Sequence, residues 1–377
     1  MAATHPVIVI GAGASGLAAA DALARRGLPV LVLEMEAHVA GPWRRRHQRL
    51  SLNTHRVFSS LPGLAYPPGT PAFPSREQVI AYLERYVEER GLKVEFGFEV
   101  VSIEPDGNGW TVGSRDGRQR HAAHVVFATG HDKVPWMPDW PGMAGFTGRL
   151  VHAADFGRVE DYAGKRVLVV GAGNSGFDVL NHLSAGKAER IWLSVRQGPS
   201  LLPKRVGKVA VHRFAGMMER LPTAVTDLAI AATQRAVLGD IRRLGLPRAP
   251  SGGATRLRDE QIAIPVDDGA IAAMRAGRIA IVAPVARFEG DRVVLADGSS
   301  LDADVVIAAT GYRTGLETIL DGLRVVDATT GRPKATGAEP TGQKGLWFIG
   351  MRPGITGHFH SAGREARALA ATIAAQS

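Results

Sequence analysis

The chain has 377 residues, 45% of them hydrophobic, with 45 glycines, no cysteine and a formal net charge of +9. This length allows two hydrophobic cores, and the many glycines are typical of an α/β protein with many turns. The lack of cysteine excludes a dithiol–disulfide active site, and the basic residues are too scattered to indicate nucleic-acid binding.

The beginning of the chain and its apolar runs bear on location. A first strand is expected within the first ten residues, which leaves no room for a signal peptide. No run reaches about 18 consecutive apolar residues, so we expect no membrane span. Together with the missing cysteines, these features predict a cytoplasmic protein.

The first motif is a dinucleotide-binding fingerprint, VIVIGAGASG, near the N-terminus. Its β-branched run passes into Gly-x-Gly-x-x-Gly and then into a helical pattern. Gly11, Gly13 and Gly16 allow a tight turn, a close approach of backbone to a pyrophosphate and close packing of helix on strand. The next strand, residues 30–33, ends in Glu34, whose carboxylate suits the free ribose 2′-hydroxyl of FAD or NAD.

A long polar and proline-rich passage follows. Gly41-Pro42-Trp43 indicates a turn, and the basic cluster RRRHQR follows at residues 44–49. A solvated loop, or contacts to a flavin pyrophosphate, explains this cluster better than DNA binding, because no nucleic-acid motif accompanies it. Residues 50–74 show little periodicity, and a structureless segment of this length inside a compact domain is usually functional.

Regular structure is expected again from Ser75. The segment Ser75-Arg-Glu-Gln is a capping box and predicts a helix that Gly91 ends. Short alternating strands are expected over residues 93–129, and they close on the buried run VVFA followed by Thr129-Gly130.

A second fingerprint, RVLVVGAGNSG, occupies residues 166–176. One fingerprint is weak evidence, but two, each led by a strand and followed by a helix, indicate two nucleotides held face to face for electron transfer. The strand at residues 191–195 carries Ser194 and is followed by Arg196, which suits a 2′-phosphate. These strand ends predict FAD first and NADPH second; ordinary solvated strand ends are the alternative for Glu34 and Arg196.

Both halves of the chain follow one order: fingerprint, short strands, buried strand, Ala-Thr-Gly. In the second half, strands over residues 279–311 close on VVIAA and Thr310-Gly311. We therefore expect an α/β fold made of two Rossmann-like units, the second inserted into the first. The expected domains are an FAD-binding domain at residues 1–150 and 311–377, and an NADPH-binding domain at residues 151–310 with a helical insertion at about 203–264. This insertion could cap the nicotinamide side, bury a dimer face, cover the substrate or contact a membrane surface.

The linker between the halves carries a family motif. The spacing Phe146-x-Gly148-x-x-x-His152-x-x-x-Phe156 matches the identifying motif of the flavin-containing monooxygenases, and it lies between the two fingerprints as in that family. Residues 50–83, with their LP, YP and FP pairs before a YL helix, look most like the short bacterial and YUCCA-like branch. Phe156 lacks the following Trp-Pro or Trp-Asp that would be typical of Baeyer–Villiger enzymes.

This resemblance implies an enzyme in which NADPH reduces FAD, oxygen adds as a C4a-(hydro)peroxyflavin, and one oxygen atom enters a small nucleophilic substrate. N-oxygenation, S-oxygenation and keto-acid oxidation are the reactions it implies. The protein must exclude water and hydrogen-bond the peroxide. Asn53 is expected to be the catalytic donor near the flavin N5 and C4a atoms, with an asparagine that caps a turn before Thr54 as the alternative.

The resemblance also assigns roles near the C-terminus and in the linker. His152 is expected to tie the linker to the nucleotide site. The helix expected at residues 362–375 directs its N-terminus at the flavin pyrimidine, where its positive end stabilises reduced flavin. His358 and His360 are expected in the loop before this helix, where either could line the substrate pocket.

The fingerprints and the resemblance give the full set of expected cofactor contacts and the rival functions. The expected contacts to FAD and NADPH are Gly11, Gly13, Ser15, Gly16, Glu34, Trp43, Thr129, Gly130, Gly171, Gly173, Asn174, Ser175, Gly176, Ser194, Arg196, Thr310 and Gly311. No metal site is expected; the expected partners are a small substrate and molecular oxygen, and a homodimer is left open. The rivals are an NADPH oxidase or reductase that serves another acceptor, and a nucleotide-sensing regulatory flavoprotein.

Overall fold

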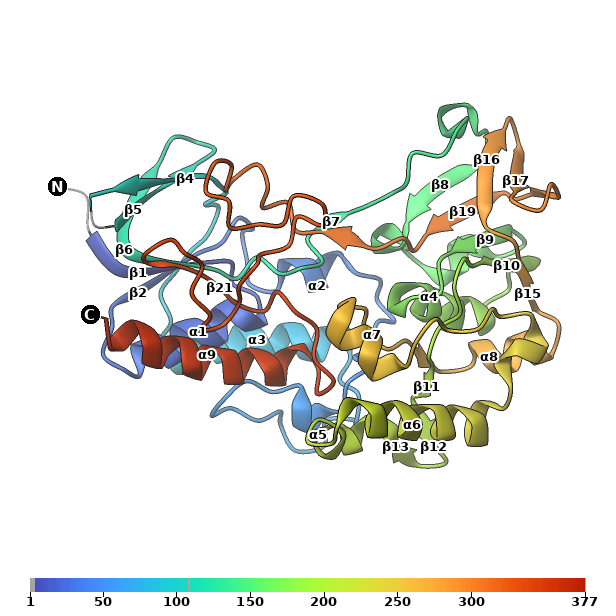
Figure 1. Cartoon of the computed structure of the whole chain (residues 1–377), viewed down its shortest axis with the longest axis horizontal. Helices are drawn as coiled ribbons and strands as arrows, with labels where there is room; N and C mark the ends of the chain where they lie inside the picture. The colour runs from blue at the N-terminus through green and yellow to red at the C-terminus, as the bar shows by residue number, and fades with distance from the viewer. Residues whose placement is uncertain (1–3, 108, 377) are drawn as a thin grey trace. The chain divides into compact units, whose positions relative to one another are not determined.

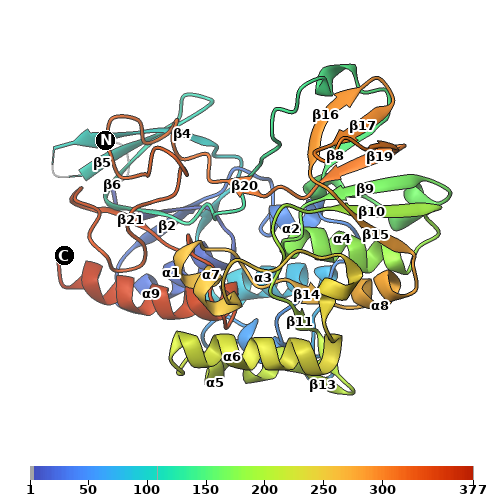
Figure 2. The same ribbon diagram turned by 45° about the vertical axis from the view of Figure 1, so that its right-hand side comes forward.

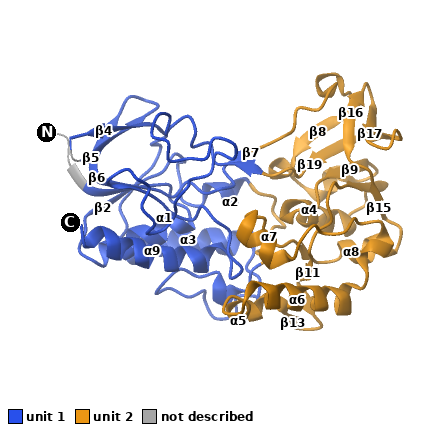
Figure 3. Cartoon of the chain, viewed as in Figure 1, with its two compact units in different colours: residues 1–45, 54–134, 312–377 blue, residues 46–53, 135–311 orange. Residues whose placement is uncertain are grey.

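The computed structural model describes residues 4–107 and 109–376, and the chain divides into two compact units (Figure 3). The first unit contains residues 1–45, 54–134 and 312–377, and the second contains residues 46–53 and 135–311. Both segments depart from the expected boundary at residue 150. Residues 46–53 belong to the second unit, and its main segment starts at Pro135, with the linker strand Arg149–His152 paired to β19 in its sheet. No helix among the described residues has the length and apolar character needed to cross a membrane.

The first unit is organised around the parallel strand β1 (Thr4–Ile10), which carries the first β-branched run. It pairs with β2 (Val30–Leu33) on one side and with β6 (Gln119–Phe127) on the other. The order of the seven-stranded sheet is β3-β2-β1-β6-β5-β4, with β21 also paired to β6. The remaining strands of this sheet are β3 (Val94–Glu95), β4 (Val100–Asp106), β5 (Gly109–Ser114) and β21 (Leu346–Phe348).

The helices of the first unit are α1 (Ala14–Ala24), α2 (Gly41–Arg45), α3 (Arg76–Arg90) and α9 (His358–Ala374). Figures 1 and 2 both show α9 beside α1. The capping box at Ser75 is confirmed, and Gly91 ends α3 in the left-handed conformation. Two expectations were wrong. The predicted turn at Gly41 is a short helix, and α9 begins at His358 instead of 362, because Gly357 with φ 87° ends the preceding loop.

The second unit repeats this plan around β9 (Arg166–Val170). Its five-stranded sheet has the order β15-β10-β9-β19-β8, with parallel pairing throughout. The other strands are β8 (Arg149–His152), β10 (Arg190–Ser194), β15 (Ile279–Val282) and β19 (Val305–Ala308). The strand that leads into the fingerprint has equivalent neighbours in both units. β1 lies between β2 and β6, and β9 lies between β10 and β19, where β6 and β19 are the strands before Ala-Thr-Gly. The duplicated order expected from the sequence is therefore confirmed.

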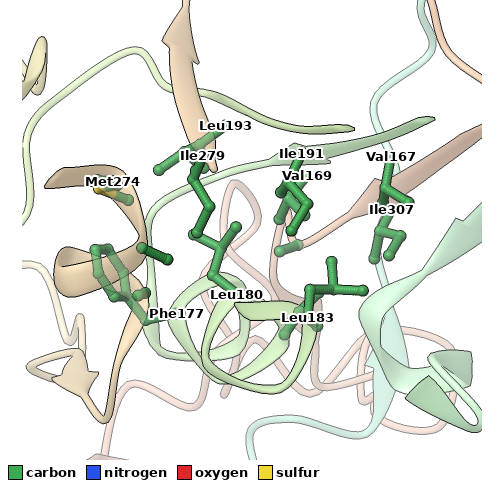
Figure 4. Close-up of a cluster of buried hydrophobic side chains, with 14 of the residues drawn as sticks. Val167, Val169, Phe177, Leu180, Leu183, Ile191, Leu193, Met274, Ile279 and Ile307 are labelled. Carbon is green, nitrogen blue, oxygen red and sulfur yellow. The ribbon is translucent and has the colours of Figure 1, made fainter. Parts of the chain in front are cut away.

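The helix α4 (Asn174–Ser184) packs on this second sheet through a continuous apolar face. Figure 4 shows Phe177, Leu180 and Leu183 of this face beside apolar side chains of the strands. All three side chains are at most 1% exposed. Burial of a leucine or phenylalanine contributes about 1.5–3 kcal/mol each, which fixes the start of α4 at the end of β9.

The rest of the second unit is an antiparallel sheet and the expected helical insertion. The sheet contains β16 (Val285–Glu289), β17 (Arg292–Leu295) and β18 (Ser300–Asp302). The helices are α5 (Ala215–Met218), α6 (Thr223–Thr233) with a π-helix at Gln234–Leu238, α7 (Gly253–Asp259) and α8 (Ala270–Arg275). The short strands of the second unit are β11 (Leu202–Pro203), β12 (Arg205–Val206), β13 (Val209–Ala210) and β14 (Val266–Asp267). Two further short strands stand where the chain passes from one unit to the other, β7 (Val134–Pro135) and β20 (Tyr312–Arg313). The insertion is helical as predicted, and the β12–β13 hairpin is an addition that the sequence did not indicate.

Candidate functional site

The turn between β1 and α1 forms a cradle of bare backbone. Gly11 has φ 105°, and a Cβ atom there would lie 2.9 Å from the carbonyl oxygen of Ala128. A Cβ atom at Gly16 would overlap the carbonyl oxygen of Gly11, whereas a Cβ atom at Gly13 would meet nothing within 4 Å. Two of the glycines are therefore required by packing, and the third leaves space beside the helix terminus for a ligand.

The turn between β9 and α4 has the same geometry. Gly171 has φ 110°, and a Cβ atom there would lie 2.5 Å from the carbonyl oxygen of Ala309. A Cβ atom at Gly176 would overlap the carbonyl oxygen of Gly171, and a Cβ atom at Gly173 would meet nothing within 4 Å. The two fingerprints are thus equivalent in conformation as well as in sequence.

Both helices begin without a side-chain cap, since Gly13 and Gly173 occupy the capping positions of α1 and α4. Their first amide groups and positive dipole ends are therefore available for an anion such as a pyrophosphate. The hydroxyl of Thr129 is buried and has no hydrogen-bond partner in the described part of the chain. A buried hydroxyl without a partner is costly, so it fits a group that a cofactor satisfies.

The equivalent threonine of the second unit differs. The hydroxyl of Thr310 donates to the carbonyl oxygen of Trp136 at 2.6 Å. Added Cβ atoms at Gly130 and Gly311 would meet nothing within 4 Å, so each Thr-Gly pair borders open space.

The carboxylate of Glu34 is held against the first cradle. It accepts hydrogen bonds from the backbone N–H of Ala12 at 2.7 Å and of Glu36 at 2.9 Å, and the residue is 7% exposed. The alternative of a solvated strand end is therefore wrong for Glu34. Its remaining lone pairs can accept hydrogen bonds from ribose hydroxyls.

Arg196 lines a cavity of about 510 Å³ beyond the ends of β10 and β15. The guanidinium is exposed, and no ion pair to it is found among the described residues. Asp297 also lines this cavity and accepts hydrogen bonds from the backbone and hydroxyl of Ser299. Ser194 is buried and donates to the carbonyl oxygen of Ala283 at 2.9 Å, so its hydroxyl is already used within the unit.

The linker motif packs as a structural element of the second unit. The Nε2 atom of His152 donates to the carbonyl oxygen of Gly311 at 3.0 Å, and its Nδ1 atom accepts from the backbone of Ala154 at 3.1 Å. Burial lowers the pKa of His152, which keeps the imidazole neutral, as this hydrogen-bond pattern requires. Phe156 is buried and stacks on Tyr162 with ring centroids 4.9 Å apart. The expected tie between linker and nucleotide site is the His152–Gly311 bond.

Asn53 lies in the second unit by the division of the chain. Its Nδ2 atom donates to the Oδ1 atom of Asn174 at 3.3 Å, and Asn174 is the first residue of α4. The side-chain amide of Asn53 therefore contacts the second fingerprint. Its catalytic role at the flavin stays a prediction. Trp43 is half-buried in α2, and Ser175 follows Asn174 in the first turn of α4.

Ser15 is buried and engages the C-terminal helix. Its hydroxyl is 3.0 Å from Nε2 of His358, which lies in the first turn of α9 and not in the expected loop. Burial lowers the pKa of His358 to about 4. His360 packs edge-on against Phe58 with ring centroids 5.4 Å apart.

Three arginines of the basic cluster form ion pairs at the exposed surface. Arg44 pairs with Glu84, Arg45 with Glu36, and Arg49 with Glu160 at 2.6 Å. The sequence missed the surroundings of His47, which lies beside Asp178 and His182 of α4. The Asp-x-x-x-His spacing, which puts both side chains on one helix face, was the available signal.

Comparison with known proteins agrees with the linker motif. Residues 8–223 match the family model described as pyridine nucleotide-disulphide oxidoreductase. The indole-3-pyruvate monooxygenase YUCCA1 of Oryza sativa subsp. japonica is 35% identical over 314 residues, covering 82% of this chain and 77% of the relative. The probable indole-3-pyruvate monooxygenase YUCCA8 of Arabidopsis thaliana is 34% identical over 366 residues, covering 93% of this chain and 85% of the relative. This chain belongs to the flavin-containing monooxygenases, within the pyridine nucleotide-disulphide oxidoreductases.

A solved structure agrees with this membership. The flavin-containing monooxygenase from Stenotrophomonas maltophilia has a TM-score of 0.76 and 27% identity, with 99% of each chain covered. The predictions of an FAD- and NADPH-dependent monooxygenase, and of a small substrate with molecular oxygen, are thereby confirmed. The oxidase and regulatory alternatives are not favoured. Disulfide chemistry of its own is excluded for this monooxygenase, which has no cysteine.

Proposed function

We propose that this monooxygenase binds FAD at the β1–α1 cradle and NADPH at the β9–α4 cradle, and that it oxygenates an aromatic 2-keto acid of the indole-3-pyruvate kind. The observation that carries the cofactor assignment is the pair of equivalent cradles whose second strands end differently, in Glu34 and Arg196. Bound flavin supplies the redox and oxygen-activating chemistry, and the chain's own groups bind, orient and exclude water.

In the first cradle, the backbone around Gly13 and the start of α1 receive the pyrophosphate. Glu34 accepts from the adenosine ribose hydroxyls, and its fixed position favours a free 2′-hydroxyl over a phosphate. Thr129 donates its buried hydroxyl to the cofactor, which satisfies a group that has no protein partner. Gly130 keeps the neighbouring space open.

In the second cradle, the backbone around Gly173 and the start of α4 receive the second pyrophosphate. Arg196 pairs with the 2′-phosphate in the cavity beyond β10. Asp297 on the same cavity suits a hydroxyl better than a phosphate, so we assign it to the ribose side. Ser194 supports the strand end through Ala283 rather than by direct contact.

The substrate assignment is supported by the relatives named as indole-3-pyruvate monooxygenases, which match from 82% to 94% of this chain at 32–35% identity. Their similarity spans both cradles and the helical insertion. Asn53 is our proposed hydrogen-bond donor to the reacting edge of the flavin, and its amide is held by Asn174. A cytoplasmic location and a homodimer stay predictions.

The proposal is tested by incubating the purified, FAD-loaded protein with NADPH, ¹⁸O₂ and indole-3-pyruvate. The balanced reaction consumes the keto acid, O₂, NADPH and a proton, and gives indole-3-acetate, CO₂, water and NADP⁺. We expect one ¹⁸O atom in the carboxylate product and one NADPH consumed per product formed. A thioether and a tertiary amine serve as competing substrates, and their preferential oxygenation would overturn the keto-acid assignment.

The role of Asn53 is tested separately. Asn53→Ala should keep NADPH consumption but divert reducing equivalents to hydrogen peroxide, because a donor beside the reacting flavin is lost. Asn174→Ala keeps the Asn53 amide and removes only its partner, so it should uncouple less. Equal product yield in wild-type protein and Asn53→Ala would refute a catalytic role for this amide.

A further inference from the structure

Two histidines and one aspartate of the second unit meet outside both cradles. The Nε2 atom of His47 is 3.3 Å from one carboxylate oxygen of Asp178, and the Nε2 atom of His182 is 3.7 Å from the other. The two imidazole rings are 4.4 Å apart at an interplanar angle of 74°. One ligand atom from each of the three residues lies within 4.8 Å of the other two.

The contacts within this cluster are not explained by hydrogen bonding alone. A separation of 3.7 Å is too long for a hydrogen bond, and His182 makes none to the described residues. Yet its side chain is only 21% exposed, and that of His47 only 7%. His47 is within hydrogen-bond distance of Asp178, whereas His182 is held beside the same carboxylate without a hydrogen bond, so its ring nitrogen stays available as a ligand.

The donor set and spacing match a metal ion of the zinc kind. Zinc binds histidine nitrogen and carboxylate oxygen at about 2.0–2.2 Å, so neighbouring ligand atoms in a tetrahedral site are about 3.4 Å apart. The His47–Asp178 distance is close to this value, and the three ligand atoms, one from each residue, lie within 4.8 Å of one another, so a small adjustment of the side chains brings them to an ion. Two imidazoles and one carboxylate are also the ligands of zinc and iron sites that keep an open position.

The cluster also has an open side. A cavity of about 210 Å³ is lined by His47 and His182, and by Phe156 and Glu160. This volume accepts a metal-bound water and a small ligand. The nearby cations each have a carboxylate of their own, Arg49 with Glu160 and Lys204 with Asp268.

We propose that His47, Asp178 and His182 form a binding site for one divalent transition-metal ion, zinc by preference, with its fourth position open to this cavity. The ion joins the loop of residues 46–53 to α4 by bonds from both segments. That loop ends at Asn53, and α4 begins at Asn174. The ion therefore holds the two segments that carry these hydrogen-bonded amides together.

The test is equilibrium dialysis of the FAD-loaded protein against Zn²⁺ after chelation, with the bound metal measured by mass spectrometry. We expect one zinc per chain for the wild-type protein. Asp178→Asn and His182→Gln each remove one ligand with little change in shape and should weaken binding at least about tenfold. The matched control is His121→Gln, which removes a partly exposed histidine 3.0 Å from Asp106 in the first unit and should leave zinc binding unchanged.

X-ray absorption of the zinc-loaded wild-type protein gives a second measurement that no folding defect of a variant can obscure. Two imidazoles and oxygen ligands at the zinc support the proposal. Less than about one-tenth of a zinc per chain at micromolar free Zn²⁺ would overturn it, as would a spectrum without two imidazoles. Equal zinc binding by correctly folded Asp178→Asn and wild-type protein would overturn it too.

Discussion

His358 makes the stability of this monooxygenase depend on pH. Its ring is partly buried beside Ser15 in the first turn of α9. This burial, with a smaller effect of His131, lowers its pKa from 6.5 to about 4, while Asp132 opposes the shift. Between about pH 6.5 and about pH 4, His358 is protonated in the unfolded chain but stays largely neutral in the folded chain. The stabilising effect is therefore complete above pH 6.5 and is lost as the pH falls towards 4.

The size of this effect follows from the two pKa values. At about pH 5 the unfolded histidine is almost fully protonated, whereas about one-tenth of the folded protein carries the proton. The free energy of unfolding should therefore fall by about 2 kcal/mol between about pH 7.5 and about pH 5 on account of this residue alone. His124, His152 and His182 also have lowered pKa values from burial and add to the total loss.

The variant His358→Gln isolates the contribution. Glutamine can still hydrogen-bond the hydroxyl of Ser15 but does not titrate in this range. Urea unfolding followed by circular dichroism at the two pH values should give a pH-dependent loss about 2 kcal/mol smaller in the variant. His121→Gln, at a partly exposed position away from Ser15, is the control and should match the wild-type protein. If His358→Gln lost as much stability as the wild-type protein between the two pH values, the reasoning about this partly buried ring would be refuted.

Three further changes test the cradles. Arg196→Gln should raise the KM for NADPH about ten- to a hundredfold, because a charge-assisted phosphate contact is lost, and should leave the KM for NADH unchanged in steady-state assays. Gly176→Ala places a methyl group against the carbonyl oxygen of Gly171. It should lower the free energy of unfolding in urea by about 1–3 kcal/mol and weaken NADP⁺ binding. An unchanged urea unfolding curve would argue against the close packing. Glu34→Gln replaces the acceptor of the Ala12 N–H and should release FAD more readily, seen as a lower flavin-to-protein ratio after gel filtration, and full retention would contradict the ribose assignment.

The sequence predicted the features that depend on local backbone geometry. Gly11 and Gly171 both stand where positive φ and a nearby carbonyl group exclude any side chain, so the fingerprints mark the same turn in each unit. The capping box at Ser75 acts within one turn and was also found where expected. In each case the physical cause lies within a few residues, and a single sequence contains it.

Features that depend on distant contacts were missed. His47 and Asp178 are separated by 131 positions, so no local pattern joins them. The start of α9 was misplaced because Gly357 packs against Thr54, which is far away in the chain. The burial of Glu34 likewise depends on the backbone of Ala12, and spacing alone indicated only its position.

The two cradles are equivalent in conformation, so residues other than their glycines must distinguish FAD from NADPH. The turns at Gly11 and Gly171 have φ values of 105° and 110° and equivalent packing. We therefore expect both turns to accept a pyrophosphate alike, without distinguishing FAD from NADPH. The difference lies at the strand ends. A 2′-phosphate beside Glu34 would face a buried carboxylate whose position two backbone N–H groups fix, and like charges at low dielectric repel strongly. On the proposed assignment, Arg196 offers the opposite charge over a cavity that Asp297 also lines, so we expect the residues at the strand ends, and not the glycines, to select each cofactor.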